Sequence, residues 1–127
     1  MEAIYEKLQE AYQTAKNYPD LAGKFIQIGI ESYTVDVATG MILYRLPGGQ
    51  NLFHAAHGKI REINPEFSEE HTVQAIRNNQ AGKSTYPEFM NEIADAGVRM
   101  YEATLVGEHK RVTYFGSGGS YEERIPI

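Results

Sequence analysis

Hydrophobic residues recur at helical spacing along several segments of the chain. Two segments show steps of four and then three residues: Leu21, Phe25 and Ile28, and Phe89, Ile93 and Ala96. Such spacing places each set on one face of a helix, which we expect to be buried. The pattern therefore predicts helices over 18–28 and 86–96, and weaker apolar stripes predict two more over 2–16 and 69–80.

Both of the stronger helices carry start and stop signals. Thr85 and Glu88 have the spacing of a capping box, and Pro87 falls in the first turn, where the missing N–H costs no hydrogen bond. Gly29 and Gly97 each follow the last apolar position, as glycine does in a left-handed helix C-terminus. We therefore expect these glycines to have a structural role.

After each of these helices the pattern changes to strict alternation. The alternating positions are Tyr33, Val35 and Val37, and Tyr101, Ala103 and Leu105. Alternation is typical of a strand with one buried face. Turns at 38–40 and 106–110 then predict hairpins to second strands at 41–46 and 111–115. A closing strand is expected within 120–127, and another within 51–63, part of the less regular segment 50–66.

The same order of elements occurs twice, and the residues also agree. An offset of 68 aligns 18–37 with 86–105 without a gap. Its identical pairs are Tyr18 with Tyr86, Pro19 with Pro87, Gly29 with Gly97, and Tyr33 with Tyr101. We interpret the chain as a single domain, 1–127, that consists of two repeats, about 1–66 and 67–127.

The predicted fold class is α+β. Two internally duplicated helix-helix-hairpin units, related by a pseudo-twofold axis, share one antiparallel sheet with the helices mainly on one face. The size of 127 residues suits one domain, and 42% hydrophobic with 23% charged residues is typical of globular proteins.

Composition excludes several classes of function. The chain has no cysteine, which rules out disulfides, thiolate metal sites and cysteine nucleophiles. A net charge of -5 argues against nucleic-acid and anionic-membrane binding, which depend on cationic surfaces. The first eight residues are charged rather than apolar, and no run reaches the ~18 apolar residues of a membrane span, so we expect a cytoplasmic protein.

Nine tyrosines and no tryptophan make the aromatic content uneven. Tyr33, Tyr44, Tyr101 and Tyr114 occupy paired positions in the two hairpins. Their rings form a possible ligand groove; alternatively, they are core or sheet-face aromatics whose hydroxyls reach the rim. The sequence leaves both interpretations open.

Two histidines three residues apart, His54 and His57, are the sharpest metal candidates, with His71 as a possible third ligand. In an extended segment, however, residues three apart point to opposite faces, and Gly58 discourages a continuing helix. We therefore assign no metal, no cofactor and no catalytic residue.

Other short motifs have structural explanations. The segment 81–85 imitates the end of a phosphate-binding loop, but Arg77 stands where the first glycine is needed, so we interpret it as a connection between helices. We expect the two glycine-rich segments, 46–50 and 116–120, to form turns between strands. The adjacent carboxylates Glu122 and Glu123 are typical of a solvated face.

Particular residues throughout the chain carry a resemblance to a known family. They are Gln80, Gly82, Ser84, Tyr86, Phe89, Ala94, Ala96, Gly97, Val98 and Tyr101, with 29–33, Tyr44 and 124–126 elsewhere. With these residues the chain resembles the YbcV-like bacterial family often labelled "phage envelope protein". The resemblance implies a bacterial or prophage origin. It supplies no catalytic residue, because the family has no established activity.

From these observations we expect a noncatalytic binding or interaction module with an unknown protein or small-molecule partner, and no nucleic acid or membrane. The alternative is a small-molecule-binding protein or modest hydrolase with a pocket on the pseudo-twofold axis. Enzymatic activity and homodimer formation stay open at this point.

Overall fold

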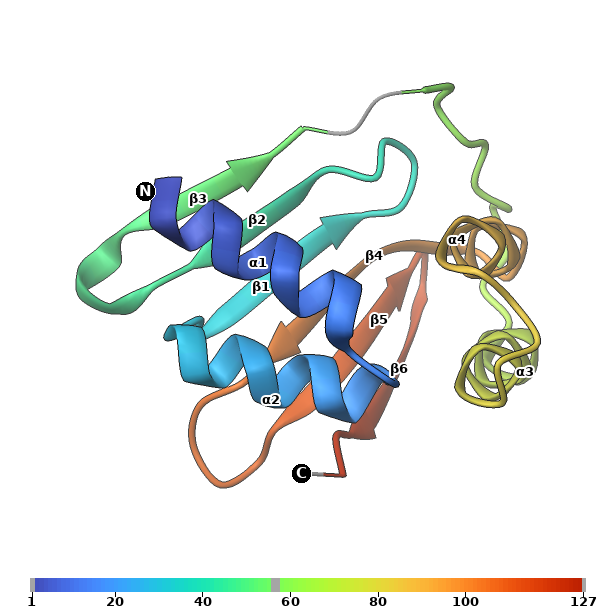
Figure 1. Ribbon diagram of the computed structural model, residues 1–127. Coiled ribbons are helices and arrows are strands. Elements are labelled where there is room, and N and C mark those ends of the chain that lie inside the picture. Colours follow the sequence, from blue (N-terminus) through green and yellow to red (C-terminus); the bar gives the residue numbers. More distant parts are fainter. Residues whose placement is uncertain (1, 56–57, 127) are drawn as a thin grey trace.

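The computed structural model describes residues 2–55 and 58–126. Its first half runs through α1 (Glu2–Thr14), α2 (Tyr18–Ile28), β1 (Ser32–Asp36), β2 (Ile42–Arg45), a short 3-10 turn η1 (Pro47–Gly49) and β3 (Asn51–His54). Its second half runs through α3 (Glu69–Gln80), α4 (Tyr86–Asp95), β4 (Val98–Thr104), β5 (Arg111–Gly116) and β6 (Gly119–Arg124). The fold is α+β, with four helices and six strands in the described residues (Figure 1).

All six strands form one antiparallel sheet in the order β3-β2-β1-β4-β5-β6. The central pair is β1 with β4, where Tyr33 lies opposite Ala103 and Val35 opposite Tyr101. Each outer half of the sheet is built from strands that follow one another in the chain. The sheet is therefore joined at its centre by two strands that lie far apart in sequence (Figure 1).

The helix boundaries follow the capping signals. Asn17 accepts a hydrogen bond of 2.9 Å from the backbone N–H of Asp20 at the start of α2. At the start of α4, Thr85 and Glu88 form a complete capping box, with bonds of 3.3 and 2.8 Å. Gly29 ends α2 with a φ of 105°, which is the left-handed region that glycine adopts without strain. These predictions are confirmed.

The two weaker helices are also present. Ser68 begins α3 by accepting a 3.1 Å hydrogen bond from the backbone N–H of His71, and the helix covers 69–80 as expected. The first helix ends at Thr14, two residues earlier than expected. Leu8 and Ala11 are its buried residues, so two turns of its apolar stripe contact the core.

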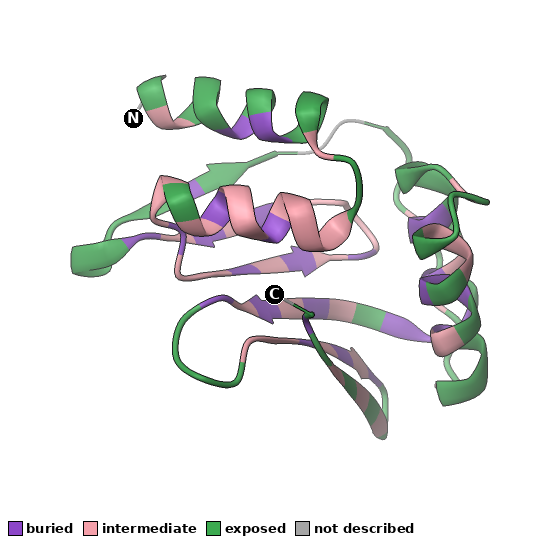
Figure 2. Ribbon diagram, turned by 60° about the horizontal axis from the view of Figure 1, so that its bottom comes forward, coloured by how far each residue is buried: buried purple, intermediate pink, exposed green. Residues whose placement is uncertain are grey.

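Alternation along the strands places the core on one face of the sheet. The buried apolar strand residues of this face are Tyr33, Val35, Ile42, Tyr44, Leu52, Val98, Tyr101, Ala103, Val112 and Tyr114. Phe25 of α2 packs edge-on against Tyr33, with ring centroids 5.5 Å apart, and Phe89 of α4 lies 6.4 Å from the ring of Tyr101. Figure 2 shows α1 and α2 lying along β1 and β2, with α3 and α4 beside the other end of the sheet.

The burial predictions for the helix stripes are wrong at two positions, Leu21 and Ile28. Phe25, Phe89 and Ile93 are buried as expected. Leu21 and Ile28 are both only half-buried: they pack against the edge of the core, and Leu21 also lines a hollow. The core of this helix therefore rests on Phe25 and Ala22, which are fully buried.

The opposite face of the sheet carries ion pairs between exposed side chains. Arg45 donates a 2.9 Å hydrogen bond to Thr34 and pairs with Glu102 at 3.4 Å. Arg111 and His109 approach Glu122 at 3.5 and 3.6 Å. All of these side chains are at least one-third exposed, so the pairs contribute little to stability.

The loops confirm the structural interpretation of the glycine-rich segments. The segment 46–50 contains η1 and links β2 to β3, and 116–120 contains the turn between β5 and β6. The segment 81–85 connects α3 to α4 and ends in the Thr85 cap. In the described part of the chain, no helix is long and apolar enough to cross a membrane.

Candidate functional site

A hollow of about 430 Å³ lies on the helix-facing side of the sheet, bounded by the α1–α2 connection, the strands, and α3 and α4. Its wall is mainly apolar and includes six tyrosines: Tyr12, Tyr18, Tyr33, Tyr86, Tyr101 and Tyr114. We call this hollow the tyrosine pocket. It lies within the size range of sites that bind small molecules.

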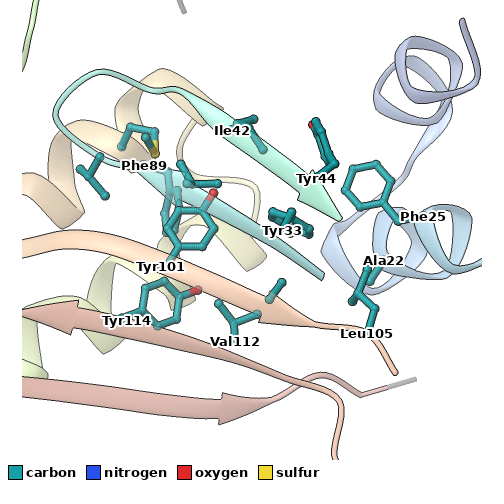
Figure 3. Close-up of a cluster of buried hydrophobic side chains, with 14 of the residues drawn as sticks. Ala22, Phe25, Tyr33, Ile42, Tyr44, Phe89, Tyr101, Leu105, Val112 and Tyr114 are labelled. Carbon is teal, nitrogen blue, oxygen red and sulfur yellow. The ribbon is translucent and has the colours of Figure 1, made fainter. Parts of the chain in front are cut away.

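Local structure brings these tyrosines to one place. Tyr33, Tyr101 and Tyr114 point to the same face of the sheet because each occupies a helix-facing position of its strand. Figure 3 shows the rings of Tyr101 and Tyr114 side by side on neighbouring strands, and their centroids are 5.4 Å apart. Tyr18 and Tyr86 are the first residues of α2 and α4, whose starts therefore face the sheet.

The tyrosine hydroxyls bond to one another in pairs. The hydroxyl of Tyr18 is hydrogen-bonded to that of Tyr33, and the hydroxyls of Tyr86 and Tyr101 are 3.2 Å apart. A third pair joins Tyr12 to Tyr44 at 2.8 Å. Because a hydroxyl pair shares one hydrogen in its bond, each pair keeps a second hydrogen that can be donated to another group.

Tyr114 differs from the paired tyrosines. Its side chain is buried, yet its hydroxyl forms no hydrogen bond with any residue that the structure describes. Its ring stacks on Tyr121 of β6 at a centroid distance of 6.3 Å. The hydroxyl of Tyr114 therefore offers the pocket both a donor and an acceptor.

Burial raises the pKa values of these phenols. Removal from water raises the pKa of Tyr12 to about 12, against the opposing effect of its bond to Tyr44. Burial likewise raises the pKa values of Tyr33, Tyr101 and Tyr114 well above the ordinary 10.0. These hydroxyls are therefore neutral near pH 7, where they act as hydrogen-bond donors and not as phenolates.

One end of the pocket is polar. Glu123 of β6 accepts hydrogen bonds from Arg77 at 2.6 Å and from the hydroxyl of Tyr121 at 2.8 Å. Burial opposes ionisation of this carboxyl, but the bonds from Arg77 and Tyr121 outweigh it and lower the pKa of Glu123. Asn79 and Gln80, from the last turn of α3, also line this end.

A larger and more open hollow of about 910 Å³ lies beside the tyrosine pocket. It is bounded by α1, β2 and the start of α4, and it shares Tyr12, Ile42 and Tyr86 with the tyrosine pocket. His54 and the highly exposed Ile60 are on its rim. The two hollows therefore adjoin across the Tyr12–Tyr44 pair.

The histidine candidates are not brought together in the described part of the chain. His54 is exposed at the end of β3, and His71 is exposed in the first turn of α3. His57 lies outside the described residues. Among the residues that are described, no three histidine, aspartate or glutamate side chains are grouped so that they could hold a metal ion.

The four tyrosines expected from the hairpins divide between the two hollows. Tyr33, Tyr101 and Tyr114 line the tyrosine pocket, whereas Tyr44 lines the larger hollow and reaches the pocket through Tyr12. Sequence reasoning missed the contribution of the helix tyrosines to this wall. The sequence does contain a signal that two of them are important, because Tyr18 and Tyr86 are an identical pair in the aligned halves.

Glu123 was also missed, and its expected position needs correction. The adjacent carboxylates Glu122 and Glu123 suggested one solvated face, but neighbouring strand residues point to opposite sides. Glu122 is on the exposed face, and Glu123 is on the face of Tyr121 and Ile125. The alternation of Tyr121, Glu123 and Ile125 was the signal that identifies the inward position.

We compared the sequence with models of known protein families. The model of a family described as "Protein of unknown function (DUF1398)" matches residues 6–121, nearly the whole chain. The chain belongs to this family. No curated protein matches the sequence.

Proposed function

We propose that this protein is a noncatalytic binding protein whose ligand is a small, uncharged, largely apolar ring compound held in the tyrosine pocket. The observation that carries the proposal is the convergence of six tyrosines around a hollow of about 430 Å³. We also propose a bacterial or prophage origin, which is supported by the resemblance to the YbcV-like family.

The chemistry of the wall supports this class of ligand. A mainly apolar wall gains free energy when a flat apolar molecule replaces water, by about 25 cal/mol for each Å² of apolar surface removed from water. Aromatic rings pack favourably against other rings in offset or edge-on arrangements. The spare hydroxyl hydrogens of the tyrosine pairs and of Tyr114 would then bind an acceptor atom on the ligand.

The same phenols favour binding over catalysis. A tyrosine acts as a base or nucleophile through its phenolate, and burial holds Tyr33, Tyr101 and Tyr114 in the protonated form. A hydrolase would need a group that is activated near neutral pH. Protonated hydroxyls in an apolar wall are instead suited to recognising an uncharged ligand.

We further propose that the two halves are repeats and that the pocket lies near their pseudo-twofold axis, with the helices mainly on one face. The order helix, helix, strand, strand, strand occurs in each half, and the strand order β3-β2-β1-β4-β5-β6 is symmetrical about the β1–β4 pair. The bonds Tyr18–Tyr33 and Tyr86–Tyr101 each join tyrosines 15 residues apart. Equivalent residues from the two halves therefore meet in one wall.

Thermal unfolding with quinoline as the probe tests the proposal. Quinoline is flat, bicyclic and uncharged near neutral pH, and its ring nitrogen accepts a hydrogen bond. At a tenfold excess over the dissociation constant, a ligand stabilises the folded state by about 1.4 kcal/mol. For a domain of this size, that raises the melting temperature by about 5 °C.

A pair of variants on α2 identifies the site. Leu21→Trp places a large ring at the half-buried wall position and should abolish the stabilisation by quinoline. Gln27→Trp, at an exposed position of the same helix that does not line the pocket, should retain it. If quinoline stabilises neither the natural chain nor Gln27→Trp, or stabilises Leu21→Trp equally, the pocket is not its binding site and the proposal is wrong.

A further inference from the structure

We propose that Glu123 makes the tyrosine pocket selective for ligands that carry an uncharged hydrogen-bond donor, such as a hydroxyl group, at the edge of the ring system. This inference rests on the proposed function, because it identifies which members of the class of small ring compounds bind best. It assigns a specificity-determining role to a residue that also joins α3 to β6 through Arg77.

The position of Glu123 in the sheet supports this role. It lies opposite Val112 on the helix-facing side of β6, one row from the pair of Tyr114 and Tyr121. Diagonal neighbours on one face of a sheet are within reach of long and aromatic side chains. Of the residues that line the pocket, all of which are in the described part of the chain, Glu123 is the one with an acidic side chain.

The hydrogen bonds of the carboxylate leave one of its oxygens available. Arg77 donates to Oε1 at 2.6 Å, and the Tyr121 hydroxyl donates to the same atom at 2.8 Å. No described residue donates a hydrogen bond to Oε2 within 3.5 Å, although the side chain of Gln80 lies close enough to the carboxyl to help lower its pKa. A carboxylate can accept about four hydrogen bonds in total, so a ligand donor can be added without displacing either partner.

The bond to such a donor would be strong. Arg77 keeps Glu123 in the ionised form, and a hydrogen bond to an ionised acceptor is roughly twice as strong as one between neutral groups. The phenols of the pocket are neutral, so none of them provides an equivalent acceptor. A ligand hydroxyl would therefore favour the end of the pocket where Glu123 lies.

The surrounding charges favour a neutral donor over an ammonium group. Arg77 already balances the charge of Glu123. Lys16 also belongs to the wall and adds a positive charge. A cationic ligand would meet net positive charge at this end of the pocket, whereas a hydroxyl makes the same hydrogen bond without that repulsion.

Matched probes separate this inference from the proposed function. Quinoline, 6-hydroxyquinoline and 6-methoxyquinoline share one ring system and an acceptor nitrogen, but only the hydroxy compound carries a donor. Isothermal titration should show that the natural chain binds 6-hydroxyquinoline about tenfold or more tightly than 6-methoxyquinoline, the ratio expected for a hydrogen bond to a charged group. Quinoline should bind with an affinity close to that of the methoxy compound.

Variants of two adjacent glutamates show which carboxylate is responsible. Glu123→Met keeps an unbranched side chain but removes the acceptor, and it should reduce the tenfold preference to less than twofold. Glu122→Met removes the same charge from the opposite face of β6 and should keep the preference. Glu123→Gln, which keeps a neutral acceptor, should give an intermediate ratio, and circular dichroism checks that each variant is folded.

The outcomes are distinct. Equal binding of the three probes by the natural chain, or a preference that persists in Glu123→Met, would overturn the role of Glu123 and leave the proposed function intact. Binding of none of the probes would overturn both proposals. A purely structural role of Glu123 would lower the melting temperature of Glu123→Met without changing the ratio of the two affinities, and that result also rejects the inference.

Discussion

The buried tyrosines make the protein sensitive to alkaline pH. Tyr33, Tyr44, Tyr101 and Tyr114 are at most 6% exposed, and burial raises the pKa of each above the ordinary value of 10.0. In the unfolded chain these phenols would ionise near pH 10. Their contribution to stability is therefore fully present below pH 10 and is lost as the pH rises toward the pKa of the folded state.

The size of this effect can be worked out for pH 11. An unfolded tyrosine with a pKa near 10 gains about 1.4 kcal/mol from ionisation at pH 11, while a folded one with a much higher pKa gains almost nothing. Four such residues lower the free energy of unfolding by about 6 kcal/mol, which is comparable to the ~5–15 kcal/mol total of a typical domain. We expect cooperative unfolding between about pH 10 and pH 12.

The assay follows structure and ionisation together. Far-ultraviolet circular dichroism reports unfolding, and the absorbance of the phenolate reports ionisation, over the same pH series. At least these four of the nine tyrosines should ionise only as the ellipticity changes. If their phenolate absorbance appears near pH 10 while the ellipticity keeps its neutral value, burial does not control their protonation and the reasoning is refuted.

A single substitution tests the calculation. Tyr114→Phe removes one titrating phenol whose hydroxyl has no hydrogen bond within the described residues, so it should change the stability at pH 7 by less than about 1 kcal/mol. At pH 11 it should be less destabilised than the natural chain by about 1.4 kcal/mol. Urea denaturation at the two pH values measures both differences.

Two further substitutions test the core and the close contacts of the chain. Phe89→Ala should lower the free energy of unfolding by about 3–5 kcal/mol, because Phe89 is 7% exposed and packs on Tyr101, and a loss below about 1 kcal/mol in a urea melt would contradict this packing. Gly97→Ala should cost about 2–4 kcal/mol, because a Cβ there would lie 2.4 Å from the carbonyl oxygen of Glu66 at a φ of +89°. Gly29→Ala, at a φ of +105°, should cost only about 1–2 kcal/mol, because the nearest atom to its Cβ would be Cδ of Pro47 at 4.0 Å. Equal losses for the two alanine variants would show that the contact with Glu66 does not affect stability.

Local signals were sufficient for the helices and hairpins. Three signals define the eleven residues of α2: the apolar stripe around Phe25, the cap at Asn17 and the glycine at the end of the helix. Each of these signals acts through residues that are neighbours in sequence. The hairpins follow from alternation and from turn glycines in the same way. These elements could therefore be predicted in the right order, with errors of one or two residues at the helix ends and up to three at the strand ends, as at β4, which begins at Val98 and not at Tyr101.

Gly97 also makes a close backbone contact that could not be predicted from the residues around it. Gly29 and Gly97 align in the two halves, and both adopt a positive φ at a helix end. Only Gly97 also has the backbone of Glu66 and Phe67 against it, at distances that exclude a side chain. That contact comes from the segment before α3, where the sequence shows no regular pattern, so it could not be inferred from the glycine itself.

The same limit explains which part of the pocket could be predicted. Tyr33 and Tyr101 could be assigned to one face of the sheet from alternation alone, but the pairing of β1 with β4 depends on contacts between the two halves and has no local signal. Tyr18 and Tyr86 reach the sheet only because α2 and α4 pack with their first turns toward it.

Glu123 is different, because its inward position was implied by the pattern Tyr121, Glu123, Ile125. A carboxylate at a core-facing position of an edge strand is costly unless another group balances it. Here Arg77, in the last turn of α3, provides that balance. An inward acidic residue in an otherwise apolar alternation therefore predicts either an ion pair or a ligand contact, and Glu123 forms the first with Arg77 through Oε1.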